Sequence, residues 1–125
     1  MTTFRPTICV DFDGVIHSYE SGWKGIDVVA DIPVPGAFEW LQDMLENSEG
    51  PIPVIYSSRS KEPAGIKAMQ EWFALHGFPF DLIDSLAFPT QKPAAYLTID
   101  DRAICFKGTF PTIKEMINFK PWNKQ

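Results

Sequence analysis

The chain has 125 residues and a mass of 14.1 kDa, which is the usual size of one domain. Apolar residues make up 45% and charged residues 22%, proportions that exclude disordered, collagen-like and coiled-coil classes. No apolar run approaches the roughly 18 residues that a membrane helix needs, so we expect no membrane partner. A chain of this size buries about two-thirds of its unfolded surface, which supports a core without disulfides.

The net charge of −5 argues against extended binding along a nucleic-acid backbone, which requires a basic face, but leaves contact with a strand end open. The first residues lack the basic and apolar regions of a secretory signal. Cys9 and Cys105 each lie in an apolar run, so we expect two buried, reduced thiols. These features together predict a cytoplasmic protein.

The first half of the chain predicts a strand, a long irregular segment and a helix. Residues 7–12 (TICVDF) are rich in strand-forming residues, and Gly22, Gly25, Pro33 and Pro35 within residues 14–35 suggest an irregular hairpin. Pro35-Gly36 then opens a predicted helix. Its apolar residues recur at helical spacing: Ala37, Trp40, Leu41, Met44 and Leu45.

The second half predicts four strands, at residues 52–56, 80–83, 95–99 and 103–106. A helix lined by Ile66, Met69 and Phe73 should end at Gly77, and a last helix is predicted over 112–119. We expect Trp40 and Trp72 in the core. Strands that alternate with amphipathic helices predict one α/β domain over 1–125, with a mainly parallel sheet. In such sheets, ligands bind beyond the carboxyl ends of the strands.

The first predicted strand ends in Asp11-Phe12-Asp13-Gly14. Side chains two apart on a strand point the same way, so both carboxylates should converge where the strand stops. Their repulsion is relieved if Asp11 stays ionised beside a divalent metal while Asp13 carries a proton and acts as an acid. Taken alone, the same residues also fit an ordinary turn.

The second predicted strand ends in Ser57-Ser58-Arg59. Hydroxyls and free backbone N–H groups at such a turn suit a phosphate, and Arg59 could add a bidentate contact to the same anion. Lys92 precedes the predicted strand at 95–99 and could offset nearby acids. An ordinary loop and a solvated lysine are the alternatives.

Asp100 and Asp101 follow the strand at 95–99. A carboxylate pair at the end of a buried strand is costly unless a metal or a basic group neutralises it. All these groups fall at one predicted sheet edge, where they would supply oxygen ligands for Mg²⁺ and donors for a phosphate.

In this order, the segments resemble the four motifs of the haloacid dehalogenase (HAD) superfamily. The motifs are Ile8–Val15 with its Asp-x-Asp-Gly, Val54–Ser57, Lys92, and Leu97–Asp101, and the resemblance spans about residues 7 to 106. It implies a three-layer α/β/α sandwich with sheet order 3-2-1-4-5.

The resemblance also implies a Mg²⁺-dependent phosphatase that works through an aspartyl-phosphate. Asp11 would be the nucleophile, Asp13 the acid and base, and Lys92 would stabilise the phosphoryl charge. Ser57, with Ser58 and Arg59, would bind the phosphate. Mg²⁺ would bind Asp11, the Asp13 main-chain carbonyl and Asp101, with Asp100 as the other candidate in the acidic pair.

The chain departs from the family pattern in two ways. The gaps between motifs are too short for a large cap domain, so we expect a capless protein with a short flap at about residues 15–34 and an open site, which oligomerisation could cover. A further acid, common in the family after the fourth motif, is missing. The flap residues His17, Tyr19, Trp23 and Lys24 are candidate substrate contacts, or simply flap packing.

Three functions follow as hypotheses. The first is hydrolysis of a phosphorylated small molecule or nucleotide. The second is a 3′-phosphatase acting on nucleic-acid ends, since the serine-arginine spacing is similar to that of phage polynucleotide kinase phosphatase domains. The third is a non-catalytic phosphate-binding domain. A signalling receiver domain fits poorly, because its lysine follows the fifth strand and Lys92 precedes the fourth.

Overall fold

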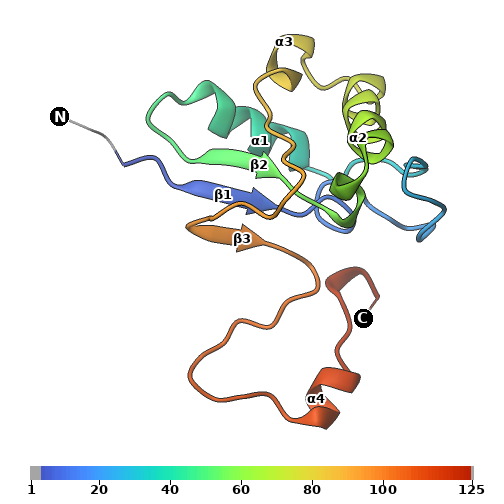
Figure 1. The fold of residues 1–125 in the computed structure, drawn as a ribbon, viewed down its shortest axis with the longest axis vertical. Coiled ribbons are helices and arrows are strands. Elements are labelled where there is room, and N and C mark those ends of the chain that lie inside the picture. The colour runs from blue at the N-terminus through green and yellow to red at the C-terminus, as the bar shows by residue number, and fades with distance from the viewer. Residues whose placement is uncertain (1–3, 125) are drawn as a thin grey trace.

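The computed structural model describes residues 4–124 as a mixed α/β fold on a small, open sheet of three parallel strands (Figure 1). The strands are β1 (Thr7–Val10), β2 (Ile52–Ile55) and β3 (Leu97–Ile99), in the order β2-β1-β3. Cys9 in the central strand is in register with Val54 on one side and Thr98 on the other. The central position of β1 explains why its apolar residues are buried.

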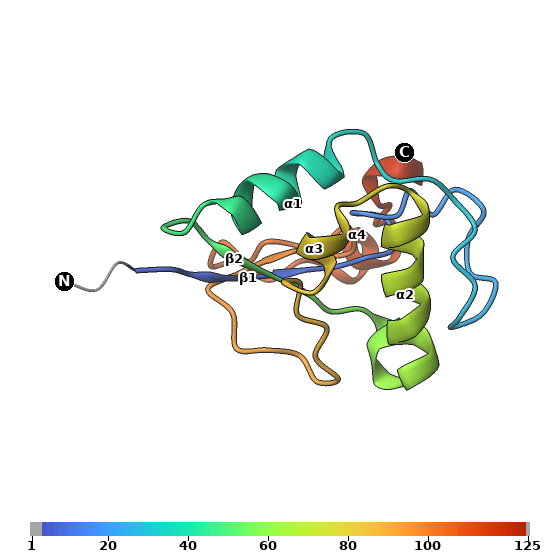
Figure 2. The ribbon, with the colours of Figure 1, turned by 90° about the horizontal axis from the view of Figure 1, so that it is seen from above.

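Helices and short turns of helix make up the rest of the regular structure: α1 (Ala37–Glu46), η1 (Ser58–Lys61), α2 (Pro63–Leu75), α3 (Phe80–Ile83), α4 (Ile113–Ile117) and η2 (Trp122–Lys124). α1 starts after Gly36, whose φ of +88° favours glycine, and α2 starts with a proline in its first turn. Figure 2 shows α1 lying over one face of the sheet and α2 near the end toward which β1 runs. Among the described residues, no helix is both long and apolar enough to span a membrane.

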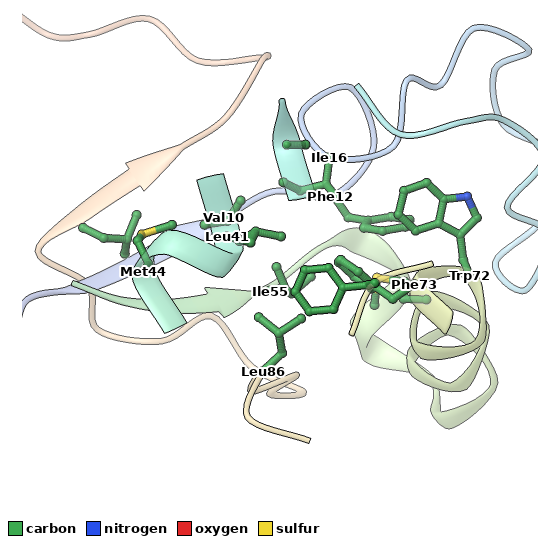
Figure 3. Packing of buried hydrophobic residues seen from close by; sticks show 13 residues of the cluster. Val10, Phe12, Ile16, Leu41, Met44, Ile55, Trp72, Phe73 and Leu86 are labelled. Atoms are coloured by element: carbon green, nitrogen blue, oxygen red, sulfur yellow. The ribbon is translucent and has the colours of Figure 1, made fainter. Parts of the chain in front are cut away.

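One apolar cluster joins the sheet to α1 and α2 (Figure 3). Val10 and Ile55 come from the strands, Leu41 from α1, and Phe73 from α2. Trp72 is 2% exposed, which confirms its predicted place in the core. The same prediction is wrong for Trp40, which is 38% exposed because it lies off the buried stripe of α1.

Two predicted strands are absent. Residues 80–83 form α3, which starts after Pro79, and the chain meets β2 only later, where Ile55 N donates to the Ala87 carbonyl at 2.9 Å. Residues 103–106 are exposed and pair with no strand among the described residues. Cys105 is therefore exposed, against our prediction, whereas Cys9 is buried as predicted.

The sheet thus contains the central 2-1-4 part of the predicted strand order, with β3 in the place of the fourth strand. The predicted strand over 95–99 is shortened to β3, and the predicted helix over 112–119 is shortened to α4. Beyond β3, the chain extends away from the sheet and then returns toward it (Figure 1).

The segment between β1 and α1 forms the irregular hairpin that the sequence predicts, called the flap below (residues 15–34). Its two legs pair at the base, where Ser18 N donates to the Ile32 carbonyl at 2.9 Å and Val34 N donates to the Ile16 carbonyl at 2.8 Å. The indole of Trp72 donates to the Asp31 carbonyl at 2.8 Å. The core helix α2 therefore fixes one leg of the flap.

Candidate functional site

The carboxyl ends of the three parallel strands meet at one cavity of about 150 Å³. Parallel strands place their following residues at the same edge, which brings together groups from four separate parts of the chain. The cavity is lined by Cys9, Asp11, Tyr56, Ser57, Ser58, Lys92, Thr98 and Asp100. Five of the predicted site residues therefore share one cavity, while Asp13, Arg59 and Asp101 are not in its lining.

Three carboxylates cluster beside this cavity. Oxygens of Asp11, Asp100 and Asp101 all lie within 4.8 Å of one another. Burial, the negative charge of Asp100 and a hydrogen bond with Asp101 raise the pKa of Asp11 to about 8. Without a cation, the Asp11 carboxyl therefore retains its proton well above the pH at which an exposed aspartate loses it.

Gly14 allows the close approach of Asp101. A Cβ at Gly14 would lie 2.1 Å from Asp101 Oδ2, and the φ of +87° at this residue is itself unfavourable for other residue types. Asp101 Oδ1 is buried and makes no hydrogen bond with any described residue. A buried carboxylate oxygen without a partner is costly, and a cation or a proton would supply the missing partner.

The donor set fits a hard divalent cation such as Mg²⁺, which prefers carboxylate oxygens. The clustered oxygens and the unpartnered Asp101 Oδ1 are what a cation would neutralise. Asp13 was predicted to contribute its main-chain carbonyl, which stays a prediction; its carboxylate lies outside the cluster and contacts His17 and Arg59.

The turn after β2 is a closed capping arrangement. Ser57 Oγ accepts from Arg59 N at 3.0 Å, Ser57 N donates to Ser60 Oγ at 3.0 Å, and Ser60 N donates to the Ser57 carbonyl at 2.9 Å. These backbone N–H groups are therefore used inside the turn, against our expectation that they would be free for a phosphate. The Ser57 hydroxyl keeps its proton available, because here it acts as an acceptor.

Arg59 is fully buried, and its guanidinium hydrogen-bonds to other residues of the chain instead of facing the cavity. Its Nε donates to both carboxylate oxygens of Asp13, at 3.0 and 3.2 Å, and its Nη1 donates to the carbonyls of Gly25 and Ile26 at 2.8 and 2.9 Å. The predicted contact between Arg59 and a phosphate would compete with these bonds, because Nε and Nη1 already donate to Asp13 and to flap carbonyls. Its Nη2 is buried and makes no hydrogen bond with the described residues.

His17 is a site residue whose exact role the sequence did not reveal. It is 1% exposed, its Nδ1 lies 2.8 Å from Asp13 Oδ1, and its Nε2 accepts from Asp31 N at 3.0 Å. Because Nε2 accepts, the proton of a neutral ring is on Nδ1, where it donates to Asp13. The spacing of four residues between Asp13 and His17 is the only sequence signal for this pair.

Of the remaining candidate residues in the flap, some pack against other residues and some are exposed to solvent. The ring of Trp23 lies 4.8 Å from the guanidinium carbon of Arg59, in a cation–π contact, and is 51% exposed. Tyr19 adopts a φ of +60°, which is rare for a residue with a side chain. Lys24 is exposed.

The C-terminal residues return to the base of the flap, which the sequence did not indicate. Trp122 Nε1 donates to the Gly14 carbonyl at 2.8 Å, and Asn123 Nδ2 donates to the Ser18 carbonyl at 3.2 Å. Trp122 also lines a second cavity, of about 250 Å³, together with Gly14, Asp100 and Asp101. The acidic cluster is therefore bounded on one side by the end of the chain.

Comparisons of this sequence with protein-family models and with curated proteins, and of its structure with solved structures, find no significant match. The functional argument therefore depends on the geometry of the site and on the motifs themselves.

Proposed function

We propose that this protein is a Mg²⁺-dependent phosphomonoester hydrolase of the HAD type, acting on a small phosphate ester or nucleotide. One observation carries the proposal: Asp11, Ser57 and Lys92 line one cavity, and the cluster of Asp11, Asp100 and Asp101 lies beside it. A nucleophilic carboxylate, a hydroxyl donor, an ammonium group and a cation site are the groups that phosphoryl transfer requires.

The proposal also extends the fold. It assigns β1, β2 and β3 to the 2-1-4 centre of the HAD-type order 3-2-1-4-5, in which residues 103–106 do not supply the fifth strand. Ala87, which bridges to Val54 of β2, would mark the position of the third strand.

Substrate binding would use the residues around the cavity. The Ser57 hydroxyl would donate to a phosphoryl oxygen, and the Lys92 ammonium would offset phosphoryl charge. Asp11, Asp100 and Asp101 would hold Mg²⁺, which when bound lowers the repulsion between a carboxylate nucleophile and an anionic phosphate.

The reaction would proceed in two displacements. Asp11 attacks phosphorus, the bond from phosphorus to the ester oxygen breaks, and the alcohol leaves with a proton. Water then attacks the aspartyl-phosphate, which releases inorganic phosphate and restores the Asp11 carboxylate. Asp13 would give and take the proton through Oδ2, whose hydrogen-bond partner among residues 4–124 is Arg59, while Oδ1 also contacts His17.

Arg59 favoured nucleic-acid 3′ ends as substrates, because an exposed guanidinium could grip a terminal phosphate. The contacts of Arg59 with Asp13 and the flap remove the particular support for that alternative. Residues 1–101 carry fifteen acidic and six basic residues, a formal net charge of −9, which favours a small ester over a nucleic-acid strand.

The test is hydrolysis of p-nitrophenyl phosphate by the wild type and by Asp11→Asn, in Mg²⁺ and in EDTA. We expect activity only in Mg²⁺, and a loss of at least about a thousandfold in Asp11→Asn, since the nucleophile is removed. Asp81→Asn is the matched control, because Asp81 is an exposed aspartate on α3, remote from the cavity.

Undiminished activity in Asp11→Asn would contradict the assigned nucleophile. If the wild type hydrolyses neither this ester nor a panel of nucleotides and 3′-phosphorylated oligonucleotides, titration calorimetry with inorganic phosphate decides the outcome. Phosphate binding without hydrolysis would replace the enzyme by a phosphate-binding domain.

A further inference from the structure

We propose that residues 103–119, here called the arm, pack against the β3 side of a second copy of this chain and so form a dimer. The arm follows β3 and leaves the rest of the molecule beyond the edge of the sheet (Figure 1). The proposal depends on four properties of this region and is independent of the proposed activity.

The first property is the apolar surface of the arm. Phe110 is 82% exposed and Ile117 is 76% exposed, and α4 has no buried residue. A five-residue helix is not stable alone in water, so α4 needs a surface to pack against. The exposed large apolar side chains of the arm are Ile104, Phe106, Phe110, Ile113, Met116, Ile117 and Phe119.

The second property is the open edge of the sheet. Among the described residues, β3 pairs only with β1, so its other edge has no strand. Tyr96 and Leu97, at the start of this strand, are 72% and 50% exposed. An uncovered, apolar edge strand favours association with another chain.

The third property is the total surface area. A compact monomer of 14.1 kDa exposes about 6,700 Å². This chain exposes 8137 Å², so its excess is about 1,400 Å². A standard protein interface buries about 800 Å² on each partner, and permanent homodimers bury more. The excess surface is therefore what one subunit of a stable dimer would bury.

The fourth property is charge. The arm contains two basic residues, Lys107 and Lys114, and one acidic residue, Glu115, a formal net charge of +1, whereas residues 1–101 carry −9. The opposite signs favour contact between the arm of one copy and the body of another, and the charge of −9 opposes contact between two bodies. A second copy is thus the occupant that the charges and the area both fit.

Both ends of the arm are held to the rest of the molecule. Asp101, just before the arm, lies in the acidic cluster, and Trp122, just after it, donates to the Gly14 carbonyl. The arm is therefore a loop tethered at the site and not a free tail.

The test is light scattering of the full chain after size-exclusion chromatography. We expect a mass of twice 14.1 kDa for the wild type. Replacing the adjacent rings in Phe106→Asp/Phe110→Asp should raise the dimer dissociation constant at least about a hundredfold, because charges then face the partner's apolar surface. Leu75→Asp/Phe80→Asp is the control, since these residues are 80% and 79% exposed outside the arm, and should leave the dimer intact.

Cross-linking identifies the partner surface. Equal amounts of ¹⁴N- and ¹⁵N-labelled chains are mixed and treated with a carbodiimide, which joins lysines to carboxylates in contact. Mixed-isotope links from Lys107 or Lys114 to acidic residues of the body would support the proposal. A monomeric wild type would overturn it, as would a dimer that the arm variant leaves unchanged or links confined to single-isotope pairs.

Discussion

Asp11 and Asp13 are two residues apart at the end of one strand, yet the fold treats their charges in opposite ways. Asp13 lies between the Arg59 guanidinium and the His17 ring, so its charge is matched inside the protein. Asp11 lies among two other carboxylates, which together with burial raise its pKa to about 8.

The difference separates a carboxylate whose charge is matched within the protein from one that needs a partner from outside. The Asp13 group ties the flap to η1 through Arg59, and it is complete without a ligand. The repulsion among the carboxylates around Asp11 is relieved only when a proton or a cation is added. Four substitutions or conditions test this contrast, given from the largest expected effect to the smallest.

Replacing Arg59 should give the largest loss in the free energy of unfolding. Arg59→Met leaves the Asp13 charge without its cation and releases the flap carbonyls that Nη1 holds, so we expect a loss of about 3 kcal/mol in the free energy of unfolding. Urea denaturation measures it. Lys61→Met is the control on the same turn, because Lys61 is exposed, and should change stability by less than about 0.5 kcal/mol. Equal losses in the two variants would contradict a structural role for the Arg59 contact.

A methyl group at Gly14 should damage the acidic cluster. Gly14→Ala forces Asp101 to move, since the new Cβ would lie 2.1 Å from Oδ2, and we expect Mg²⁺ affinity to fall at least about tenfold. Gly22→Ala has a similar φ, +78°, but no atom within 4 Å, so it isolates the backbone strain of about 1 kcal/mol. Calorimetric titration with Mg²⁺ compares the two variants, and unchanged affinity in Gly14→Ala would remove Asp101 from the site.

Raising the pH should destabilise the metal-free protein. The pKa of Asp11 is about 8 in the folded chain, against 3.8 for an ordinary aspartate, so between these pH values the folded state binds one more proton than the unfolded state. Stability therefore falls as pH rises from about 4 to about 8 and levels off above that. We expect the melting temperature in EDTA to drop by several degrees from pH 5 to pH 8.

Mg²⁺ should reduce that drop, because the cation replaces the proton, and Asp11→Asn should remove most of it in EDTA. A melting temperature that falls equally in Asp11→Asn would assign the pH dependence to another group. The contacts of Asp13 with Arg59 and His17 are complete without a cation, so we expect them to add nothing to the effect of Mg²⁺ on the melting temperature.

The smallest effect should come from Trp23. Its ring stacks on the Arg59 guanidinium but is half exposed, so Trp23→Ala should cost about 0.5–1 kcal/mol in the free energy of unfolding. Trp23→Tyr retains an aromatic face and should recover part of this loss. Urea denaturation of both variants measures the difference, and identical losses would show that the contact contributes only through buried area.

Local patterns predicted the central elements because their signals agree with their final environment. β1, β2, α1 and α2 combine apolar periodicity with glycine or proline at their ends, and all four form. Residues 80–83 and 103–106 have only short apolar runs, which do not distinguish a strand from a turn of helix or an exposed loop. Whether such a run becomes a strand depends on whether a neighbouring strand pairs with it, and neither segment belongs to the sheet of the described residues.

The order of the acidic, hydroxyl and basic residues in the sequence determined which groups could share a site. Parallel strands bring their carboxyl ends together, so Asp11, Ser57 and Asp100, which each follow a strand, could be placed at one edge in advance, and Lys92 was added by its order among the motifs.

Only the tertiary structure decided what each charge contacts. Nothing in the sequence distinguishes an arginine that faces a cavity from one that turns inward, and the burial of Arg59 depends on the flap closing over it. Hydrogen bonds and ion pairs act over a few ångströms, so they are set by how distant segments pack. The periodicity of apolar residues predicts helices and strands, but it does not predict which side chains from distant segments will lie within hydrogen-bonding distance.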